Sequence, residues 1–500
     1  MKAVIMAGGR GTRIRSVASD IPKPMIPVLG KPVLQYQIEN LKRDGFEDII
    51  LVTGYLSGAI RDHFGDGSRF GVRISYFNED VPMGTAGALY YLKDRLQESF
   101  ILLMGDLMLS VDFGRFLEEH KRNGAAVTLF AHPNSHPYDS DLIVTDETGR
   151  LEMFTEDICG ENADTSLTAR PLSKPVLGII SKKQERGEDF YYHNLVNSGI
   201  YAISPEVLSG VPDPCGEAET AKTSDHAPEA AGNAPQPDKN GVPAGEKAAR
   251  KVDLDKDIIR PLISSGKVCA YRSTEYVKDM GTPERYEETA EAVRSGLVER
   301  KNLSGKQKCI FLDRDGTINV EKGFLNNAAG MELLPGAAES IKRINQSEYL
   351  AVLITNQPVS ARGECSFEGL DEIQRKFETL LGREGAYIDS IYYCPHHPDS
   401  GFEGEVKELK FRCRCRKGKS GMINDAARDL NIDLSASWMI GDKTSDIKCG
   451  QGAGTRTVLL ETGSAGSDGR FCITADLVCR DLPDAVSRIL SDTGNENRKN

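Results

Sequence analysis

Two closely spaced aspartates, Asp313 and Asp315, have the arrangement most specific for chemistry in this chain. They follow the apolar run Ile310–Leu312, which predicts a buried strand, and they precede Gly316 in a predicted turn. Strand alternation would aim both carboxylates the same way, whereas a turn lets them diverge into different roles. One could attack phosphorus and form an acyl phosphate, while the other protonates the leaving oxygen and later activates water. A turn rich in Asp and Gly after a strand is also common without any chemistry, so the motif needs further support.

Three later segments supply that support. Thr355 and Asn356 end the apolar run LAVLIT, Lys417 lies in CRCRKGKSGM, and Asp442 follows the run SWMIG with Asp446 four residues later. With the paired aspartates, these segments resemble the four motifs of haloacid dehalogenase phosphatases over residues 308–462. The resemblance implies that Asp313 is the nucleophile and Asp315 the general acid/base. It assigns phosphate or substrate binding to Thr355, Asn356 and Lys417, and Mg²⁺ binding to Asp313, Asp442 and the main-chain carbonyl of Asp315. A metal is needed there because a carboxylate and a dianionic phosphate repel each other.

Two pairs of soft ligands lie between these motifs. Cys394 and His396 form one pair, and Cys413 and Cys415 form the other, separated by a charged loop. Three thiolates and one imidazole suit tetrahedral Zn²⁺, and a complete protein ligand set indicates a structural site. Unligated cysteines are the alternative, which the paired spacing disfavours. His397 competes with His396, but the Cys-x-His spacing of the resembling family favours His396.

The cysteine loop narrows the resemblance. The segments DRDGT, Cys-Pro-His and Cys-x-Cys-Arg-Lys are similar to D-glycero-D-manno-heptose 1,7-bisphosphate phosphatases and to their relatives, the histidinol-phosphate phosphatases. This resemblance implies that Arg416, next to Lys417, contacts the substrate. Gly418 and Ser420 stand where those families often have prolines.

A glycine-rich loop follows the first apolar run, KAVIMA, near the N-terminus. Three glycines would let backbone N–H groups turn toward an anion, and Arg10 and Arg13 could bond phosphate oxygens. Lys23, between two prolines, would hold an ammonium at a fixed point. A tight strand-to-helix turn is the alternative. The chain has no Walker lysine-serine pair and no GxGxxG here, which argues against P-loop and dinucleotide binding. The three glycines are Gly8, Gly9 and Gly11.

This opening resembles the signature of sugar-1-phosphate nucleotidyltransferases, and the resemblance covers roughly residues 1–295. It implies that Gly8, Gly9, Gly11, Arg13 and Lys23 contact the triphosphate at the reacting centre. It further implies base and ribose contacts from Gly84 and Thr85, sugar contacts from Asn197, and Mg²⁺ binding by Asp106 and Asp279. Carboxylates at strand ends are suitable Mg²⁺ ligands, although each alone could be a solvated loop residue. The segment Phe154–Asp157 departs from the family's usual Phe-x-Glu-Lys-Pro, so the sugar contacts of that stretch are not expected here.

The fusion itself predicts the substrates. Removal of the 7-phosphate from heptose 1,7-bisphosphate would yield heptose 1-phosphate, which a transferase could join to a guanylyl group from GTP, giving GDP-heptose for surface polysaccharide. The α-anomer and the guanine follow only from the pathway that such a fusion resembles. The alternatives are a transferase for another sugar, such as mannose 1-phosphate, a histidinol-phosphate phosphatase, or a non-catalytic nucleotide sensor. The joint presence of Arg13, Lys23, Asp106 and Asp279 disfavours the sensor.

The elements that must position these residues alternate between apolar strands and helices in both halves of the chain. This pattern predicts an α/β fold with two doubly wound domains, the first with a Rossmann-like mixed sheet and the second with a zinc loop. We expect a transferase domain at residues 1–297, a polar linker at 298–308, a phosphatase domain at 309–490 and a disordered tail at 491–500. Residues 211–250 are poor in large apolar side chains and are expected to form a disordered insertion.

Composition limits the partners and the location. The net charge of −12 over 500 residues opposes non-specific binding to nucleic acid or to an anionic membrane. The sequence contains no run of about 18 apolar residues, so we expect no membrane span. The N-terminal apolar run is too short for a signal peptide. The eleven cysteines, of which three lie in the expected metal cluster with His396 and the others are scattered singly, indicate a reducing compartment. We therefore expect a cytoplasmic enzyme. The sequence does not specify the oligomeric state and is compatible with a homo-oligomer.

Overall fold

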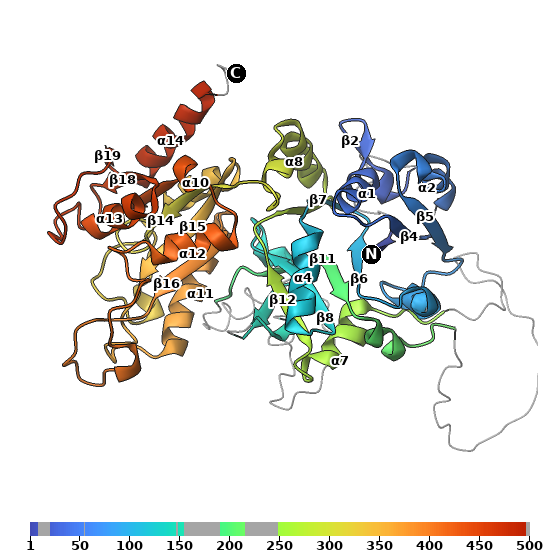
Figure 1. Cartoon of the computed structure of the whole chain (residues 1–500), viewed down its shortest axis with the longest axis horizontal. Helices are drawn as coiled ribbons and strands as arrows, with labels where there is room; N and C mark the ends of the chain where they lie inside the picture. The colour runs from blue at the N-terminus through green and yellow to red at the C-terminus, as the bar shows by residue number, and fades with distance from the viewer. Residues whose placement is uncertain (9–20, 55, 147–148, 155–190, 216–248, 497–500) are drawn as a thin grey trace, which may run out of the picture.

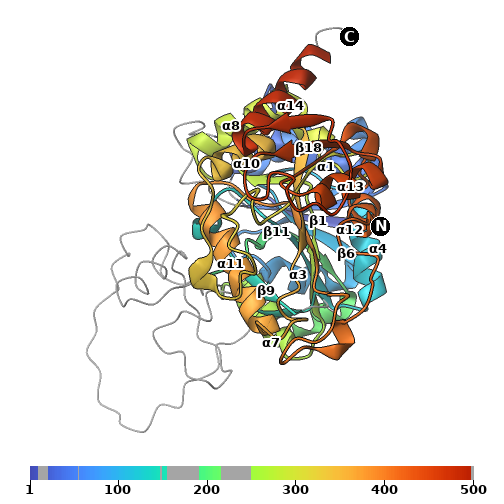
Figure 2. The same ribbon diagram turned by 90° about the vertical axis from the view of Figure 1, so that its left-hand side faces the viewer.

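The structure is a computed structural model, and it describes residues 1–8, 21–54, 56–146, 149–154, 191–215 and 249–496. Two β-sheets organise it, one in each half of the chain, and helices flank both (Figure 1). The N-terminal half, blue to green, and the C-terminal half, orange to red, lie side by side. In the view turned by 90° the two halves overlap, with α14 extending beyond them (Figure 2). The predicted α/β class with two sheet-based units is confirmed.

The N-terminal sheet is mixed and has seven strands in the order β12-β8-β11-β6-β1-β4-β5. Only β11 runs antiparallel to its neighbours, β6 and β8. Three small pairs accompany the sheet: β7 with β13, β9 with β10, and β2 with β3. The strands of this half are β1 (Lys2–Met6), β2 (Pro27–Val28), β3 (Lys31–Pro32), β4 (Asp48–Thr53), β5 (Arg73–Asn78), β6 (Phe100–Met104), β7 (Leu107–Ser110), β8 (Val127–His132), β9 (Ile143–Thr145), β10 (Leu151–Phe154), β11 (Val196–Ile203), β12 (Val268–Arg272) and β13 (Tyr276–Asp279).

Helices cover both faces of this sheet, as the continuous apolar strands require. The α-helices are α1 (Val33–Arg43), α2 (Ser57–Phe64), α3 (Gly87–Leu92), α4 (Phe113–Asn123), α7 (Arg260–Ile263), α8 (Pro283–Arg294) and α9 (Leu297–Arg300). The shorter helical turns are η1 (Lys23–Met25), η2 (Ser68–Phe70), η3 (Lys93–Arg95), η4 (Pro137–Asp139), η5 (Pro205–Gly210) and the π-helical η6 (Leu254–Ile259).

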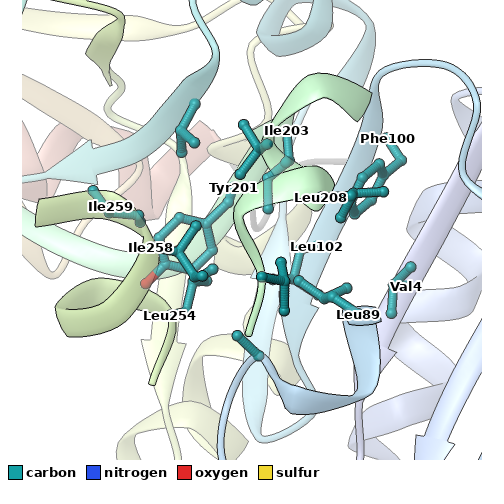
Figure 3. Packing of buried hydrophobic residues seen from close by; sticks show 14 of the residues in the cluster. Val4, Leu89, Phe100, Leu102, Tyr201, Ile203, Leu208, Leu254, Ile258 and Ile259 are labelled. Carbon is teal, nitrogen blue, oxygen red and sulfur yellow. The ribbon is translucent and has the colours of Figure 1, made fainter. Parts of the chain in front are cut away.

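Strand β1 is buried on both sides, which explains its unbroken apolar sequence. Val4 packs into one core cluster and Ile5 into another on the opposite face. In the first cluster, Figure 3 shows Tyr201 among Leu254 and Ile258, so β11 is packed against the π-helical turn. Burial of each such side chain contributes about 1.5–3 kcal/mol. The core therefore fixes the strand ends, where the predicted site residues lie.

The C-terminal sheet is parallel throughout and has six strands in the order β16-β15-β14-β17-β18-β19. Its strands are β14 (Lys308–Leu312), β15 (Tyr349–Asn356), β16 (Ser390–Cys394), β17 (Trp438–Gly441), β18 (Arg456–Leu460) and β19 (Leu477–Cys479). Its helices are α10 (Ala337–Asn345), α11 (Phe367–Arg383), α12 (Gly421–Asp429), α13 (Thr444–Ala453) and α14 (Leu482–Glu496), with the turns η7 (Ala328–Gly330), η8 (Lys407–Leu409) and η9 (Leu434–Ala436). The central β14 and β17 end next to each other, which is where ligands bind in such sheets.

The predicted linker, residues 298–308, is packed rather than solvated. It begins inside α9, and Leu303 is buried. The buried carboxylate of Glu275 accepts the N–H groups of Leu303 and Asp112, at 3.0 and 2.7 Å. Burial raises the pKa of Glu275 to about 7. Within the segment, Lys301 and Gln307 donate to the carbonyls of Asn345 and Asn302, at 3.3 and 2.8 Å. We retain the segment as the proposed boundary between the domains.

Two further expectations concern the segment ends. The helix α14 continues to Glu496, so the expectation of a disordered tail from residue 491 was wrong for residues 491–496. A helix that is already docked through Val486 and Ile489 extends at little cost, even over polar residues. Most of the expected insertion, residues 216–248, lies outside the described residues. At its borders, the N–H of Arg250 donates to the carbonyl of Pro214 at 2.8 Å.

Among the described residues, none of the helices has both the length and the apolar character needed to cross a bilayer.

Candidate active sites

Three carboxylates converge where the C-terminal sheet ends. Asp313 follows β14, Asp442 follows β17, and Asp446 lies in the first turn of α13. All three are buried, and one oxygen from each lies within 4.8 Å of the others. The sequence places Asp446 in the last motif but does not predict it as a metal ligand. Its spacing of four residues after Asp442, across a strand-to-helix turn, was the signal.

Two lysines balance this negative charge. The Nζ of Lys417 lies 2.5 Å from Asp313 Oδ1 and 2.9 Å from Asp446 Oδ1. The Nζ of Lys443 lies 3.8 Å from Asp442 Oδ1 and pairs with Glu321. Burial opposes the charged form of Lys417, but the two aspartates outweigh it and raise its pKa, so the ammonium persists.

Burial and mutual repulsion raise the pKa of two of the carboxyls. The pKa of Asp442 rises to about 6, first because of burial and then because of Asp313. The pKa of Asp446 rises to about 7, mainly because of burial. The cluster is therefore short of positive charge when all three groups are ionised.

The donor set fits a hard divalent cation. Asp442 Oδ1 is buried and accepts no hydrogen bond from any described residue. Carboxylate oxygens are the ligands that Mg²⁺ prefers. Gly316 and Gly463, both with positive φ, pack so closely on Asp442 that a methyl group at either would collide with its carboxylate. These glycines hold Asp442 in place.

The second aspartate of the pair points elsewhere. The carboxylate of Asp315 accepts hydrogen bonds from Arg314, from Asn319 at 2.9 Å and from Gln357 at 2.7 Å. Burial would raise the pKa of Asp315, but Arg314, Asn319 and Gln357 outweigh it and lower the pKa. Its carboxylate is not part of the three-carboxylate cluster, in which Asp446 takes the third place; a metal contact from Asp315 would have to come from its carbonyl.

The other predicted phosphate-binding residues line the same strand ends. The buried hydroxyl of Thr355, at the end of β15, accepts a hydrogen bond from Gln357 at 3.0 Å. Asn356 Oδ1 accepts the N–H of Lys417 at 2.9 Å, which fixes the lysine backbone. Gln357, Asn319 and Arg314 were not found from the sequence, because the spacing says nothing about which side chains turn toward Asp315.

The four soft ligands come together beside this site. Cys394 Sγ lies 3.4 Å from the Sγ atoms of both Cys413 and Cys415, and His396 Nδ1 lies 3.2 Å from Cys415 Sγ. These separations suit the edges of a tetrahedron around one Zn²⁺. His397 is not in the group; its Nδ1 bonds the main chain of Asp399.

Arg416 supports the cysteine loop. It donates to the carbonyl of His396 at 2.9 Å, and its N–H donates to Cys413 Sγ at 3.3 Å. In this arrangement its contacts are with the loop, and its predicted contact with substrate stays a prediction.

In the N-terminal half, Lys23 and Asp106 meet. Lys23 begins the turn η1 directly after Pro22, and its Nζ contacts the carboxylate of Asp106, which follows β6. A Cβ at Gly105 would lie 2.9 Å from the carbonyl of Met6, so β1 and β6 end in close contact. The ammonium and the carboxylate are thereby placed at the same edge of the sheet as Gly8. Gly9, Gly11 and Arg13 lie outside the described residues.

Asp279 reaches the same region from β13. It pairs in register with Leu107 on β7, and the N–H of Met280 donates to the carbonyl of Asp106 at 3.2 Å. The backbones of the two predicted metal ligands are therefore neighbours. The carboxylate of Asp279 accepts hydrogen bonds from Arg285 at 2.8 and 2.9 Å, an ion pair that the sequence did not predict.

The segment around Gly84 and Thr85 is held in place by contacts with Val252 and Leu254. Gly84 has φ +88° and packs against the backbone of Val252, which excludes any side chain there. The hydroxyl of Thr85 accepts the N–H of Leu254 at 2.8 Å, so it helps to hold the loop. Asn197 donates to the hydroxyl of Tyr201 at 3.0 Å.

Glu79 is a residue that the sequence did not single out. One of its oxygens lies 3.4 Å from the position of a Cβ on Gly8, and the other is buried without a hydrogen-bond partner among the described residues. Burial raises its pKa to about 7. An acceptor of this kind, next to the glycine loop, could pair with N–H groups of a bound base.

A cleft with a volume of about 1100 Å³ adjoins the predicted sugar and metal residues. Asn197, Asp279 and Arg285 line it from the N-terminal half, and Lys342 and Arg383 from the C-terminal half. The acceptor side of the predicted transferase site therefore opens toward the second domain.

Comparison with known proteins places both halves. The family described as Nucleotidyl transferase matches residues 2–296, more than half of the chain. The chain belongs to this family. A second match, to HAD-like hydrolases, covers residues 414–485.

The C-terminal half is 38% identical over 183 residues to the D-glycero-beta-D-manno-heptose-1,7-bisphosphate 7-phosphatase of Haemophilus ducreyi, an alignment covering 36% of this chain and 97% of that protein. This half therefore belongs to the same phosphatase family. The prediction of a nucleotidyltransferase joined to a phosphatase of the haloacid dehalogenase type is confirmed.

Two solved structures are also similar. The D,D-heptose 1,7-bisphosphate phosphatase of B. bronchiseptica, complexed with magnesium and phosphate, is 32% identical and covers 37% of this chain and 99% of its own, with a TM-score of 0.33. HddC from Yersinia pseudotuberculosis, complexed with GMP-PN, is 21% identical and covers 58% of this chain and 99% of its own, with a TM-score of 0.40.

Proposed function

We propose that this enzyme makes GDP-heptose in two steps: it removes the 7-phosphate of D-glycero-D-manno-heptose 1,7-bisphosphate and then joins the heptose 1-phosphate to a guanylyl group from GTP. The observation that carries the proposal is the fusion of a transferase with a relative of heptose bisphosphate phosphatases. The product of such a phosphatase is a sugar 1-phosphate, the acceptor that a sugar nucleotidyltransferase consumes.

In the first step, Asp313 attacks the phosphorus of the 7-phosphate, and Asp315, which must carry a proton for this step, gives that proton to the leaving sugar oxygen. Water then attacks the acyl phosphate with Asp315 as base, which restores Asp313 and releases inorganic phosphate. Lys417, held by Asp313 and Asp446, stabilises the phosphoryl oxygens together with Thr355. Mg²⁺ bound by Asp313, Asp442 and Asp446 would supply the charge that lets a carboxylate approach a dianion.

In the second step, an oxygen of the sugar 1-phosphate attacks the α-phosphorus of GTP, and pyrophosphate leaves. Catalysis requires positioning and charge neutralisation, which Lys23 supplies beside Asp106. We propose that Asp106 and Asp279 hold Mg²⁺, and that Gly8, Gly9, Gly11 and Arg13 contact the triphosphate. We also propose structural Zn²⁺ at the four cysteine and histidine ligands.

GTP is favoured by Glu79. One oxygen of the Glu79 carboxylate accepts no hydrogen bond from the residues that the structure describes, and the ionised group can accept both the N1–H and the amino N–H of guanine. Adenine presents an acceptor at N1, which would face that carboxylate unfavourably. Because GTP and phosphorylated sugars are cytoplasmic metabolites, we propose a cytoplasmic location.

The deciding experiment incubates the full chain with heptose 1,7-bisphosphate, Mg²⁺ and GTP, and measures products by mass. GDP-heptose together with phosphate and pyrophosphate is expected. We propose the α-anomer, whereas the curated relatives carry the β-anomer in their names, so each anomer is supplied separately. Parallel reactions contain ATP, CTP, UTP or TTP, mannose 1-phosphate, or histidinol phosphate. Turnover of any of these in preference to the heptose substrates would overturn the proposal.

A further inference from the structure

We propose that Glu378, on helix α11 of the phosphatase domain, is a positioning residue for the acceptor cleft of the transferase. This inference rests on the proposed transferase function. The phosphatase domain would then support the active site of the transferase domain, although the two reactions are chemically separate.

The first observation is the contact between α11 and a segment of the N-terminal half, Tyr192–Asn194. The carboxylate of Glu378 accepts the N–H of Asn194 at 2.8 Å and lies 2.9 Å from His193 Nδ1. His193 Nε2 lies 2.8 Å from Asp371, about two turns of helix before Thr379. The hydroxyl of Thr379 accepts the N–H of Tyr192 at 3.0 Å. Glu378 is only 6% exposed, so these bonds are shielded from water.

The second observation is that the contact continues into the cleft. The side chain of Asn194 donates to the carbonyl of Asn134 at 2.7 Å and accepts its N–H at 3.1 Å. Asn134 Oδ1 in turn accepts the N–H of His136 at 3.0 Å. His136 Nδ1 lies 3.2 Å from Arg285, whose other nitrogen binds the carboxylate of Asp279.

A continuous path of hydrogen bonds therefore joins Glu378 to Asp279, a proposed metal ligand of the transferase. Asn134, His136, Arg285 and Asp279 all line the cleft. The loop that carries Asn134 and His136 also packs closely against α11 and the residues that follow this helix. A Cβ on Gly382 would lie 2.9 Å from Pro137, and one on Gly385 would lie 3.5 Å from the carbonyl of Ser135.

The phosphatase reaction makes no use of this path. The C-terminal end of α11 leads into β16 at the edge of the sheet where the strands begin, whereas Asp313 and Asp442 lie where strands end. A buried carboxylate is costly unless it is paired. The shorter contacts of Glu378 are with Asn194 and His193 of the N-terminal half, whereas Gln374 of its own helix donates to it at 3.5 Å. Glu378 is therefore placed to affect the transferase without reaching the phosphatase site.

The test uses full-length variants and measures both reactions. For Glu378→Ala we expect the KM for heptose 1-phosphate to rise about tenfold, as for the loss of one or two charge-assisted hydrogen bonds. The KM for GTP and the kcat/KM for phosphate release should change less than about twofold. Glu378→Gln, which can still accept the Asn194 N–H, should restore most of the acceptor affinity. Glu372→Ala removes an exposed carboxylate from the same helix and serves as the matched control.

A double-mutant cycle tests whether the effect travels through the path. If Glu378 acts through Asn194, then Asn194→Ala should raise the same KM, and the double variant should be no worse than the stronger single variant. Equal acceptor KM in Glu378→Ala and wild type would overturn the inference, as would additive effects of the two changes. Loss of phosphate release in Glu378→Ala would show that this variant does not fold. In that case the acceptor KM values of Asn194→Ala and Glu378→Gln test the inference. Failure of the wild-type chain to make a nucleotide sugar would instead refute the proposed function.

Discussion

The two active sites of this chain are built in different ways. In the phosphatase site, Asp313, Asp442, Asp446 and Lys417 converge within one buried cluster at the ends of neighbouring parallel strands. In the proposed transferase site, Lys23, Asp106 and Asp279 come from separate segments, and the cleft proposed to hold the acceptor takes one wall from the other domain. The compact site is thus complete within one domain, whereas the open cleft depends on the other domain for one of its walls.

The sites also lie at opposite ends of the strands of the C-terminal sheet. The cleft touches Lys342, Arg383 and Asp389, which precede β15 and β16, while the phosphatase cluster follows β14 and β17. Strand β15, with eight residues, spans about 26 Å. The comparison therefore predicts two separable activities, and four variants can test it.

Asp313→Asn should have the largest effect. Loss of the nucleophile is expected to lower phosphate release by about 10⁴-fold or more. Nucleotidyl transfer from supplied heptose 1-phosphate should remain within about twofold of wild type. Phosphate and pyrophosphate assays on the same preparation check both outcomes. Loss of both activities would mean that the two sites are not separate.

Lys23→Ala should have the reverse selectivity. Removing the ammonium beside Asp106 is expected to lower nucleotidyl transfer by about 10²–10³-fold, since it stabilises developing phosphate charge. Phosphate release should be unchanged. Lys31→Ala, which removes a partly exposed lysine paired with Glu39, is the control and should leave both rates intact. A wild-type transfer rate in Lys23→Ala would remove this residue from the reacting centre.

Cys413→Ser should act on stability more than on chemistry. A closed zinc site contributes folding free energy, so loss of one thiolate is expected to lower the Tm of the C-terminal domain by several degrees and to reduce its zinc content. Calorimetry and metal analysis measure both. Cys472→Ser, at an exposed cysteine outside the cluster, is the control. An unchanged Tm with unchanged zinc content would contradict the ligand assignment.

The smallest effect concerns the interface and depends on pH. Burial lowers the pKa of His193, but Glu378 and Asp371 outweigh it and raise the pKa to about 9. Because the folded pKa lies above the usual value of about 6.5, the ion pairs contribute fully below pH 6.5 and are lost as pH rises through about 9.

Replacement of this histidine isolates that contribution. In His193→Gln, the free energy of unfolding should lose part of its decline between pH 6.5 and 9, measured by denaturant titration across that range. The parallel profile of Glu372→Ala should match wild type. If the histidine variant kept the full pH dependence, another group would be responsible.

Much of the phosphatase site could be predicted from the sequence, because its residues follow apolar strands in a parallel sheet. Asp313, Thr355 and Asp442 each end a strand, and strand ends in such a sheet meet at one edge. The direction of the Asp315 carboxylate could not be predicted, because Arg314, Asn319 and Gln357 hold it only after folding. The clustering of Cys394, His396, Cys413 and Cys415 was foreseeable from their paired spacing, whereas the burial of the linker was not.

The sequence by itself determined the two domain types, the strand-end aspartates, the lysine between prolines and the cysteine-histidine ligand set. These are local properties, since apolar runs, turns and short spacings act over a few residues. Only the tertiary structure decided that Asp446 joins the carboxylates, that Glu79 lies beside the glycine loop, and that Glu378 reaches the transferase cleft through Asn194. Those contacts join residues far apart in the chain, and only the packing of the folded core brings them together.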